Sequence, residues 1–480
     1  MTPPDGDVAM WFEGVEMSKP VALLLWIAGL ALASNSAAIS QVAPDPIGPL
    51  PAPGAASPAA NPATPTPAPL PPPVIELPPP VWPINDAQDL LAVVQSIATE
   101  GLSPRDYGAV PLAAAITSND PARLAIVATD SFNHLSSDLA LGHVRGEDRI
   151  DWHVVDRDLD TTRQRALLDG ALAQHKVGDA LRGLLPTHPQ YGALRTALAD
   201  PKNAAQANVI RLNMDRWRWL PHDLGTRYII TNVPAYTATL VENGVALSRH
   251  RAVAGAIKTP TPQLSAIATG VILNPWWEVP TSISHEVAHK GGFVAVRDPV
   301  TKAIVRYRQP PGPSNALGQM KFVMPNPYAI YLHDTNAKSR FNSQVRAFSH
   351  GCIRTDKIGD LARLLLAEDS GTWDDARVTD AIQSKKSIQA SFTKPLPVYI
   401  VYFTAAATVD GNIVNYDDVY RRDSTVIAAL LNQPRARPKS TAPEAALAKS
   451  AATAADTATA AASTPKQKPA KPLPTVPPTR

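Results

Sequence analysis

The chain contains a single cysteine, Cys352, within the segment Ser-His-Gly-Cys-Ile-Arg at residues 349–354. A histidine, His333, lies nineteen residues before it. A thiol is a poor nucleophile while it is protonated, and a nearby imidazole can accept its proton and hold a thiolate–imidazolium pair. These two residues therefore indicate nucleophilic catalysis by cysteine with a histidine base. The alternative is a buried structural cysteine near chance histidines.

The neighbours of Cys352 favour an acyl-transfer site. Gly351 lets the backbone approach a substrate closely, and the amides around Cys352 can point at a carbonyl oxygen as it becomes an oxyanion. Arg354, two residues further on, would lie on the same side of a strand as Cys352. Its guanidinium offers a planar fork for a carboxylate.

A second candidate site is the segment His-Glu-Val-Ala-His at residues 285–289, which matches the pattern of zinc peptidases. There, two histidines one helical turn apart bind zinc and the glutamate activates water. A third ligand is missing, because position 295 is Ala295 and residues 290–367 contain no glutamate. Pro280 and the glycines at 291–292 also make a continuous helix doubtful. We expect no metal and no cofactor, and interpret the segment as a partly exposed helical turn beside a mobile loop.

The elements that would position Cys352 and His333 have the period of strands. Residues 329–332 predict a strand that ends at His333 and could lie beside the segment carrying Cys352. Residues 236–242 and 245–253 predict a hairpin, because the Asn-Gly pair at 243–244 adopts the positive φ angles of a tight turn. Further strands are expected at residues 227–233, 270–273, 397–404 and 412–416, with a helix at 357–367. Residues 206–433 are thus predicted to form a mostly β domain with a few helices.

Residues 84–205 have the apolar spacing of helices. In the first helix Asn85 or Asp86 is the expected N-cap and Gly101 the expected end. Asp120 and Pro121 should begin a second helix, and further helices are predicted at residues 160–174, 177–185 and 190–198. No phosphate loop or Cys/His cluster occurs there, so we expect a helical scaffold domain. The predicted fold class is α+β, helical domain first.

The two ends of the chain are predicted to lie outside the folded domains. Residues 1–40 have the form of an export signal or N-terminal anchor, with Met17 as the expected initiator. Proline-rich and alanine-rich residues 41–83 predict an extended linker. Residues 434–480 predict a disordered basic tail with eight Lys/Arg and two Asp/Glu, which leaves a net charge of −3 for the rest of the chain. Export would place the protein in the periplasm or cell envelope, with a membrane tether only if the N-terminal segment is uncleaved.

This composition bears on function in two ways. No folded region has the concentrated basic surface that nucleic-acid binding requires. In an exported chain a lone cysteine cannot form an internal disulfide, so Cys352 is a structural thiol, an intermolecular partner or a reactive nucleophile. A free thiol in an oxidising compartment is a liability, which favours the catalytic interpretation.

The sequence around these residues resembles the L,D-transpeptidase catalytic domain of the YkuD type. The resemblance lies in His333 and Asp334, fourteen further residues, and then Ser-His-Gly-Cys at 349–352. Flanking segments are similar to the larger YcbB-like branch, at residues 213–221, 274–280, 309–318 and 331–335. Residues 185–191 resemble the scaffold domain of that branch. We find no clear peptidoglycan-binding module between the scaffold and the catalytic domain.

The resemblance implies an exported acyltransferase that rebuilds peptidoglycan. Cys352 would attack the carbonyl of the third residue of a donor tetrapeptide stem, with His333 as base and then acid, and the terminal D-alanine would leave. The thioester would pass to an amine of an acceptor stem and form a 3→3 cross-link. Gly351 and Cys352 would supply oxyanion amides.

The resemblance also assigns expected roles to the remaining residues. Arg354, Ser349 and Tyr331 would bind substrate. Asp334 and His350 would orient His333 or shape its loop. Residues 281–307 would form a lid over the site, which also gives the His-Glu-Val-Ala-His segment a role without a metal.

Three alternatives stay open. With water in place of the acceptor, the same Cys/His site would make an L,D-carboxypeptidase or amidohydrolase of peptidoglycan stems. A wall-binding protein with a degenerate site would lack catalysis, and a zinc peptidase would depend on residues 285–289.

Overall fold

The computed structural model describes residues 80–367, 372–408 and 410–431. The expected export signal at 1–40, nearly all of the linker at 41–83 and the basic tail at 434–480 lie outside the described residues. Within the described ranges, no helix is long and apolar enough to span a membrane.

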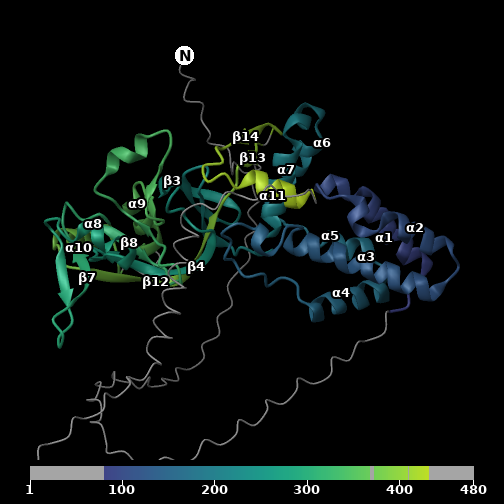
Figure 1. Cartoon of the computed structure of the whole chain (residues 1–480), viewed down its shortest axis with the longest axis horizontal. Helices are drawn as coiled ribbons and strands as arrows, with labels where there is room; N and C mark the ends of the chain where they lie inside the picture. Colours follow the sequence, from purple (N-terminus) through teal and green to yellow (C-terminus); the bar gives the residue numbers. More distant parts are fainter. Residues whose placement is uncertain (1–79, 368–371, 409, 432–480) are drawn as a thin grey trace, which may run out of the picture. The chain divides into compact units, whose positions relative to one another are not determined.

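The first part of the described chain is helical. Figure 1 shows α1, α2, α3 and α5 side by side, and their buried apolar side chains form one core cluster. The helices are α1 (Ile84–Ser96), η1 (Ile97–Glu100), η2 (Pro104–Tyr107), α2 (Ala109–Thr117), α3 (Pro121–Leu141), η3 (Gly146–Asp148), α4 (Thr161–Gln174), α5 (Val177–Arg182), α6 (Pro189–Ala199), η4 (Pro201–Gln206) and α7 (Ala207–Arg218).

Local sequence explains where α3 begins and where η1 ends. Asp120 caps α3 by accepting hydrogen bonds from the amides of Ala122 and Arg123 at 3.1 and 3.0 Å, as predicted. Gly101 ends η1 with a φ of 78°, also as predicted. The predicted cap of α1 is wrong, because the N-cap residue is Pro83 and it makes no side-chain bond. Asp86 is instead buried and contacts His175 Nδ1 at 2.9 Å.

The rest of the described chain is mostly β. A nine-stranded sheet has the order β10-β3-β11-β9-β8-β4-β12-β1-β2, and β13 pairs with β14. Its strands are β1 (Arg227–Asn232), β2 (Thr237–Glu242), β3 (Val245–Gly255), β4 (Leu264–Leu273), β8 (Met320–Val323), β9 (Leu332–His333), β10 (Ala347–Ser349), β11 (Ile353–Thr355) and β12 (Ile388–Val401); the separate pair is β13 (Ala405–Ala407) and β14 (Ile413–Asn415). The helices of this part are η6 (Lys338–Asn342), α9 (Ile358–Leu366), α10 (Asp375–Gln383) and α11 (Asp423–Leu430).

Turn chemistry fixes the β2–β3 hairpin. Asn243 and Gly244 have φ angles of 50° and 79°, which are the positive values of a tight hairpin turn. This confirms the predicted hairpin. The predicted strand at 329–332 is displaced: Ala329 has a φ of 54°, and the amide of Ile330 donates to the Asn326 side chain. The strand therefore begins only at Leu332.

The helical and β parts share buried contacts. Tyr191 of α6, Trp217 of α7 and Val401 of β12 belong to one core cluster. The Gln190 side chain donates to the carbonyl of Ala407 at 2.8 Å and accepts from its amide at 3.1 Å. A helical region followed by a mostly β domain confirms the predicted fold class.

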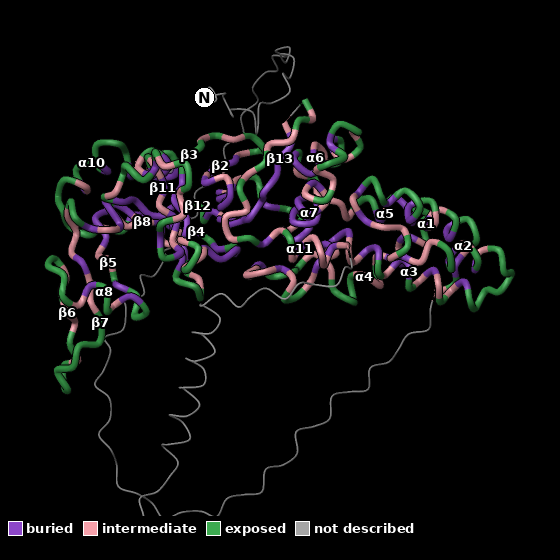
Figure 2. The backbone as a smooth tube through the Cα atoms, turned by 45° about the horizontal axis from the view of Figure 1, so that its top comes forward, coloured by how far each residue is buried: buried purple, intermediate pink, exposed green. Residues whose placement is uncertain are grey.

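Residues 277–309 form a small layer of their own. Strands β5 (Trp277–Glu278), β7 (Ile304–Gln309) and β6 (Val294–Arg297) make a three-stranded sheet in that order. Between β5 and β6 the chain forms the short helices η5 (Thr281–Ile283) and α8 (Ser284–Val287). Val279, Ile283 and Val287 form a core separate from that of the large sheet. Figure 2 shows much of the β6–β7 hairpin exposed. This layer includes residues 281–307, the segment in which a lid is expected.

Candidate active site

Strand register brings the two predicted catalytic residues together. Strand β11 runs parallel to β9, with Ile353 opposite Leu332 and Arg354 opposite His333. Ile353 and Leu332 are fully buried in the core of the sheet. Because successive side chains of a strand point to opposite faces, Cys352 and His333 lie on the other face, as diagonal neighbours across the two strands.

Ring contacts extend this face on both sides of His333. The rings of Tyr331 and His333 have centroids 5.6 Å apart. Lys321 pairs with His333 across β8 and β9, and its Nζ lies 4.9 Å from the centroid of the Tyr331 ring. One face of three adjacent strands therefore carries a thiol, an imidazole, a phenol and two cationic side chains.

Cys352 sits at the end of the loop between β10 and β11 and is partly exposed. Its Sγ lies 3.5 Å from the carbonyl oxygen of Ala329. Burial raises the pKa of the thiol, whereas hydrogen bonds from the backbone and side chain of Tyr331 and the charges of Lys321 and Arg354 act to lower it. The thiol is therefore mainly protonated at neutral pH, beside groups that would stabilise its thiolate.

His333 is buried, with 4% of its surface exposed. Burial, together with the positive charge of Arg354, lowers the pKa of its imidazole to about 3, and the nearby Asp334 backbone acts weakly in the opposite direction. Its Nδ1 is buried without a hydrogen-bond partner among the described residues. At neutral pH the imidazole is therefore uncharged, and the resting site holds a neutral thiol and a neutral base. The thiolate–imidazolium pair considered above would form only as the thiol reacts.

The loop before Cys352 is held by Ser349. The buried Ser349 hydroxyl donates to the carbonyl of Cys352 at 2.5 Å and accepts from the amide of Gly351 at 3.1 Å. Ser349 thus holds the turn, and its expected role in substrate binding stays a prediction. Because the Gly351 amide is engaged by Ser349, it is not free to bind an oxyanion in this conformation. The Cys352 amide is the other expected donor.

Gly351 has a conformational reason to be glycine. Its φ is 111°, and a Cβ on it would lie 3.1 Å from Cδ1 of Ile330. Its carbonyl accepts from the Thr261 hydroxyl at 2.7 Å. These features fix the tight turn that presents Cys352.

Asp334 does not orient His333 through its carboxylate. Its Oδ2 accepts from the amide of Gln319 at 2.9 Å, and its Oδ1 pairs with Lys338. Asp334 also lies against Gly318, where a Cβ would approach Oδ2 to 2.3 Å. It shapes the loops that lead into β8 and η6, the second of the two roles expected for it.

His350 contacts the small layer formed by residues 277–309. Its Nε2 lies 3.3 Å from Oε1 of Glu286, with both side chains nearly half exposed. The four-residue helix α8 ends at Val287, so it does not carry the second histidine of the His-Glu-Val-Ala-His segment. Among the described residues, no group of three or more His, Cys, Asp or Glu side chains could hold a metal ion.

Sequence spacing did not identify Lys321 as a member of the site. It lies twelve residues before His333, and only the antiparallel β8–β9 pairing brings the two together. Burial lowers the pKa of Lys321, while Cys352 and Glu278 act to raise it. The sequence offers only the alternating pattern of a short strand around Lys321, and this pattern does not specify which strand pairs with it.

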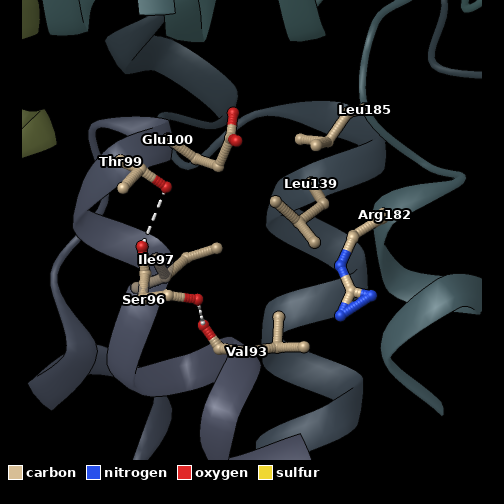
Figure 3. Close-up of a pocket in the computed structure, with 8 residues that line it drawn as sticks. All are labelled: Val93, Ser96, Ile97, Thr99, Glu100, Leu139, Arg182 and Leu185. Atoms are coloured by element: carbon tan, nitrogen blue, oxygen red, sulfur yellow. Dashed lines mark hydrogen bonds between the residues drawn. The ribbon is translucent and has the colours of Figure 1, made fainter. Parts of the chain in front are cut away.

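A small pocket occurs in the helical part, away from the catalytic strands (Figure 3). Its polar side chains include Ser96 and Thr99, whose hydroxyls donate to the carbonyls of Val93 and Ser96 at 3.0 and 2.9 Å. None of its lining residues belongs to β8, β9 or β11. The lining residues are Val93, Ser96, Ile97, Thr99, Glu100, Leu139, Arg182 and Leu185.

Fold and site define a mostly β domain with a cysteine–histidine pair on one sheet face. Residues 226–382 match the family model of the L,D-transpeptidase catalytic domain (YkuD), and residues 79–198 match that of the Scaffold domain. Residues 226–382 are therefore similar to L,D-transpeptidase catalytic domains of the YkuD type, and residues 79–198 are similar to Scaffold domains.

Individual proteins are similar to parts of the chain. The chain is 32% identical over 232 residues to a candidate L,D-transpeptidase of Haemophilus influenzae, covering 42% of this chain and 46% of the relative. The matched region thus spans about half the length of that protein. Among solved structures, an L,D-transpeptidase from Mycobacterium smegmatis matches with 15% sequence identity and a TM-score of 0.21. The match covers 36% of this chain and 58% of that chain. L,D-transpeptidase 3 from Mycobacterium tuberculosis matches with 14% sequence identity and a TM-score of 0.20. The match covers 36% of this chain and 60% of that chain.

Proposed function

We propose that this protein is an L,D-transpeptidase that forms 3→3 cross-links between peptidoglycan stems. The observation that supports this most directly is the position of Cys352 and His333 on one face of two paired parallel strands, inside a domain of the matching family. The proposal extends to an exported protein acting in the periplasm or cell envelope.

In the first half of the reaction, His333 accepts the thiol proton as Cys352 Sγ attacks the carbonyl carbon of the third stem residue. A neutral imidazole is the required form of this base. The tetrahedral intermediate collapses as the carbon–nitrogen bond breaks, and His333 returns the proton to the departing nitrogen. D-alanine leaves, and the stem remains on Cys352 as a thioester.

In the second half, an amine of the acceptor stem attacks the thioester. His333 accepts a proton from the amine, the carbon–sulfur bond breaks, and the proton passes to the departing thiolate. A new amide joins the two stems and the free thiol is restored. Water in place of the amine would give the carboxypeptidase.

The cations around the thiol support these steps electrostatically. Lys321 and Arg354 lower the pKa of Cys352 through their charges, so they favour the thiolate that forms during attack and leaves during transfer. Tyr331 adds a hydrogen bond to the same sulfur. The amide of Cys352 is the proposed donor to the oxyanion.

Incubation of the full chain with a purified disaccharide-tetrapeptide, followed by mass spectrometry, tests the proposal. The expected product is a dimer that has lost one alanine, with none formed by Cys352→Ala. Trapping should also show Cys352 carrying the stem without its terminal residue. Monomeric tripeptide as the sole product would favour the hydrolase, and no product dependent on Cys352 would overturn both.

A further inference from the structure

A second arginine, Arg340, lies near the loop that presents Cys352. Arg340 belongs to η6, and its Cζ lies 4.6 Å from the centroid of the Phe348 ring. Phe348 is part of β10 and precedes Cys352 by four residues. Stacking on this ring holds the Arg340 guanidinium beside the loop that presents the nucleophile.

Arg354 lies at the other end of the same loop, opposite His333. Its Nε is buried without a hydrogen-bond partner among the described residues. The charge of Arg340 also lowers the pKa of Arg354, although burial of Arg354 is the larger cause. The two guanidinium groups are thus close enough to repel each other.

Arg251, a nearby arginine, has a carboxylate partner, which Arg340 and Arg354 lack among the described residues. Arg251 of β3 pairs with Asp356 at 2.7 Å and also donates to the Asn342 side chain. In the described ranges neither Arg340 nor Arg354 has a carboxylate within ion-pair distance. Two adjacent guanidinium groups without an anion, one of them with a buried unsatisfied N–H, leave uncompensated positive charge.

We propose that Arg340 and Arg354 together bind the terminal α-carboxylate of the donor stem, and that Arg340 determines selectivity for stems that end in a free carboxylate. This inference rests on the proposed function. In a donor tetrapeptide that carboxylate is two bonds from the scissile nitrogen, so it must lie close to Cys352 Sγ during attack. Arg354, two residues after Cys352, and Arg340 of η6, which stacks on Phe348 just before the loop that presents Cys352, are placed to hold it.

The same geometry gives the pair a role in the order of events. The carboxylate departs with the leaving amino acid, so the acyl-enzyme loses the anion that the two guanidinium groups held. Recognition by Arg340 therefore acts on the donor before acylation. It should not affect the reaction of the thioester with an acceptor amine.

The test compares two donors on the full chain: the disaccharide-tetrapeptide, and the same molecule with its terminal carboxylate converted to an amide. Release of the terminal residue and the mass of the acyl-enzyme are measured. The parent should prefer the free carboxylate by about 10- to 100-fold in kcat/KM, the range expected for a lost charge-assisted hydrogen bond. Arg340→Gln should lose most of that preference through a slower reaction of the free acid alone. Arg340→Lys should fall between, because it keeps the charge but not the fork.

Arg123→Gln is the matched control, since it removes one exposed arginine from α3 in the helical part. It should retain the parent's preference. Equal slowing of both donors by Arg340→Gln, or slowing of neither, would overturn the inference.

A binding measurement separates this inference from the proposed function. In the Cys352→Ala background, calorimetry should show tighter binding of the free acid than of the amide, and Arg340→Gln should abolish the difference. That result without turnover by the parent would leave the carboxylate site standing while the transpeptidase proposal fails. No difference between the two donors in binding would overturn the carboxylate site whether or not the parent reacts.

Discussion

His333 is paired across the β9–β11 ladder with Arg354, and Cys352 is its diagonal neighbour. The imidazole therefore faces a permanent positive charge from a cross-strand position. That charge and burial both disfavour the imidazolium. The relationship explains how the imidazole can stay uncharged at neutral pH beside the thiol that we propose it deprotonates.

Cys352 should react slowly with a neutral alkylating agent at pH 7. Burial raises the pKa of the thiol, so its thiolate fraction is below that of an ordinary cysteine. The iodoacetamide rate, followed by intact mass, should rise continuously through pH 9. The single cysteine makes the readout unambiguous. Tyr331→Phe should slow the reaction by about 3- to 10-fold because it removes a hydrogen bond to the thiolate.

The control for Tyr331→Phe is Tyr328→Phe, since Tyr328 is an exposed neighbour whose ring stacks on His153. It should leave the alkylation rate unchanged. A fast alkylation rate that is already constant from pH 5 would instead reveal a preformed thiolate–imidazolium pair.

His333 should make stability depend on pH. Its folded-state pKa of about 3 lies below the ordinary value of 6.5, so between these values the unfolded chain binds more protons. The contribution of His333 to the free energy of unfolding is therefore at its maximum above pH 6.5. It decreases as the pH falls from 6.5 towards 3. Urea unfolding between pH 4.5 and 7 should show a shallower pH dependence for His333→Gln than for the parent.

Other histidines affect this profile but not the comparison. Burial lowers the pKa of His188 to about 4 and also lowers that of His250, so both act in the same direction as His333. The hydrogen bond to Asp138 raises the pKa of His143, which acts in the opposite direction. Identical pH slopes for the parent and His333→Gln would show that His333 titrates normally in the folded protein.

Sequence was sufficient to predict the general fold and to propose a nucleophile and a base, which the strand register brings together. Cys352 was identified because it is the only thiol, and the β2–β3 hairpin because Asn-Gly has few other uses. The hydrogen bonds of Ser349 could not be predicted, since they depend on backbone groups brought near by a turn. Lys321 approaches Cys352, and Arg340 approaches Arg354, only through the folding of separate segments, which a linear pattern does not specify.

Ser349→Ala should destabilise the protein by about 1–3 kcal/mol, the cost of leaving buried polar groups unpaired. The substitution removes the acceptor for the Gly351 amide and the donor to the Cys352 carbonyl. Chemical unfolding gives the stability, and activity should fall because the loop no longer fixes Cys352. Ser282→Ala, at an exposed serine, should change stability by less than about 0.5 kcal/mol. A stable and active Ser349→Ala protein would contradict the bracing role.

Gly351→Ala should reduce activity by at least about 100-fold, because a misplaced nucleophile is costly. A side chain there meets both the unfavourable φ of 111° and the Cδ1 of Ile330. Gly291→Ala is the matched control, since its Cβ would have no atom within 4 Å. Product formation and thermal unfolding should be compared for both variants. Similar activity in the two would show that the loop adapts to a side chain.

Glu286→Gln should distinguish a surface contact with His350 from zinc chemistry. Glu286 contacts His350 at 3.3 Å, and both side chains are well exposed, so the pair should contribute little to stability. We expect less than a tenfold change in activity for Glu286→Gln and no effect of a chelator on the parent. In a zinc peptidase this glutamate would activate water, so the same substitution would nearly abolish activity. Loss of activity on chelation, with recovery on adding zinc, would return residues 285–289 to the catalytic site.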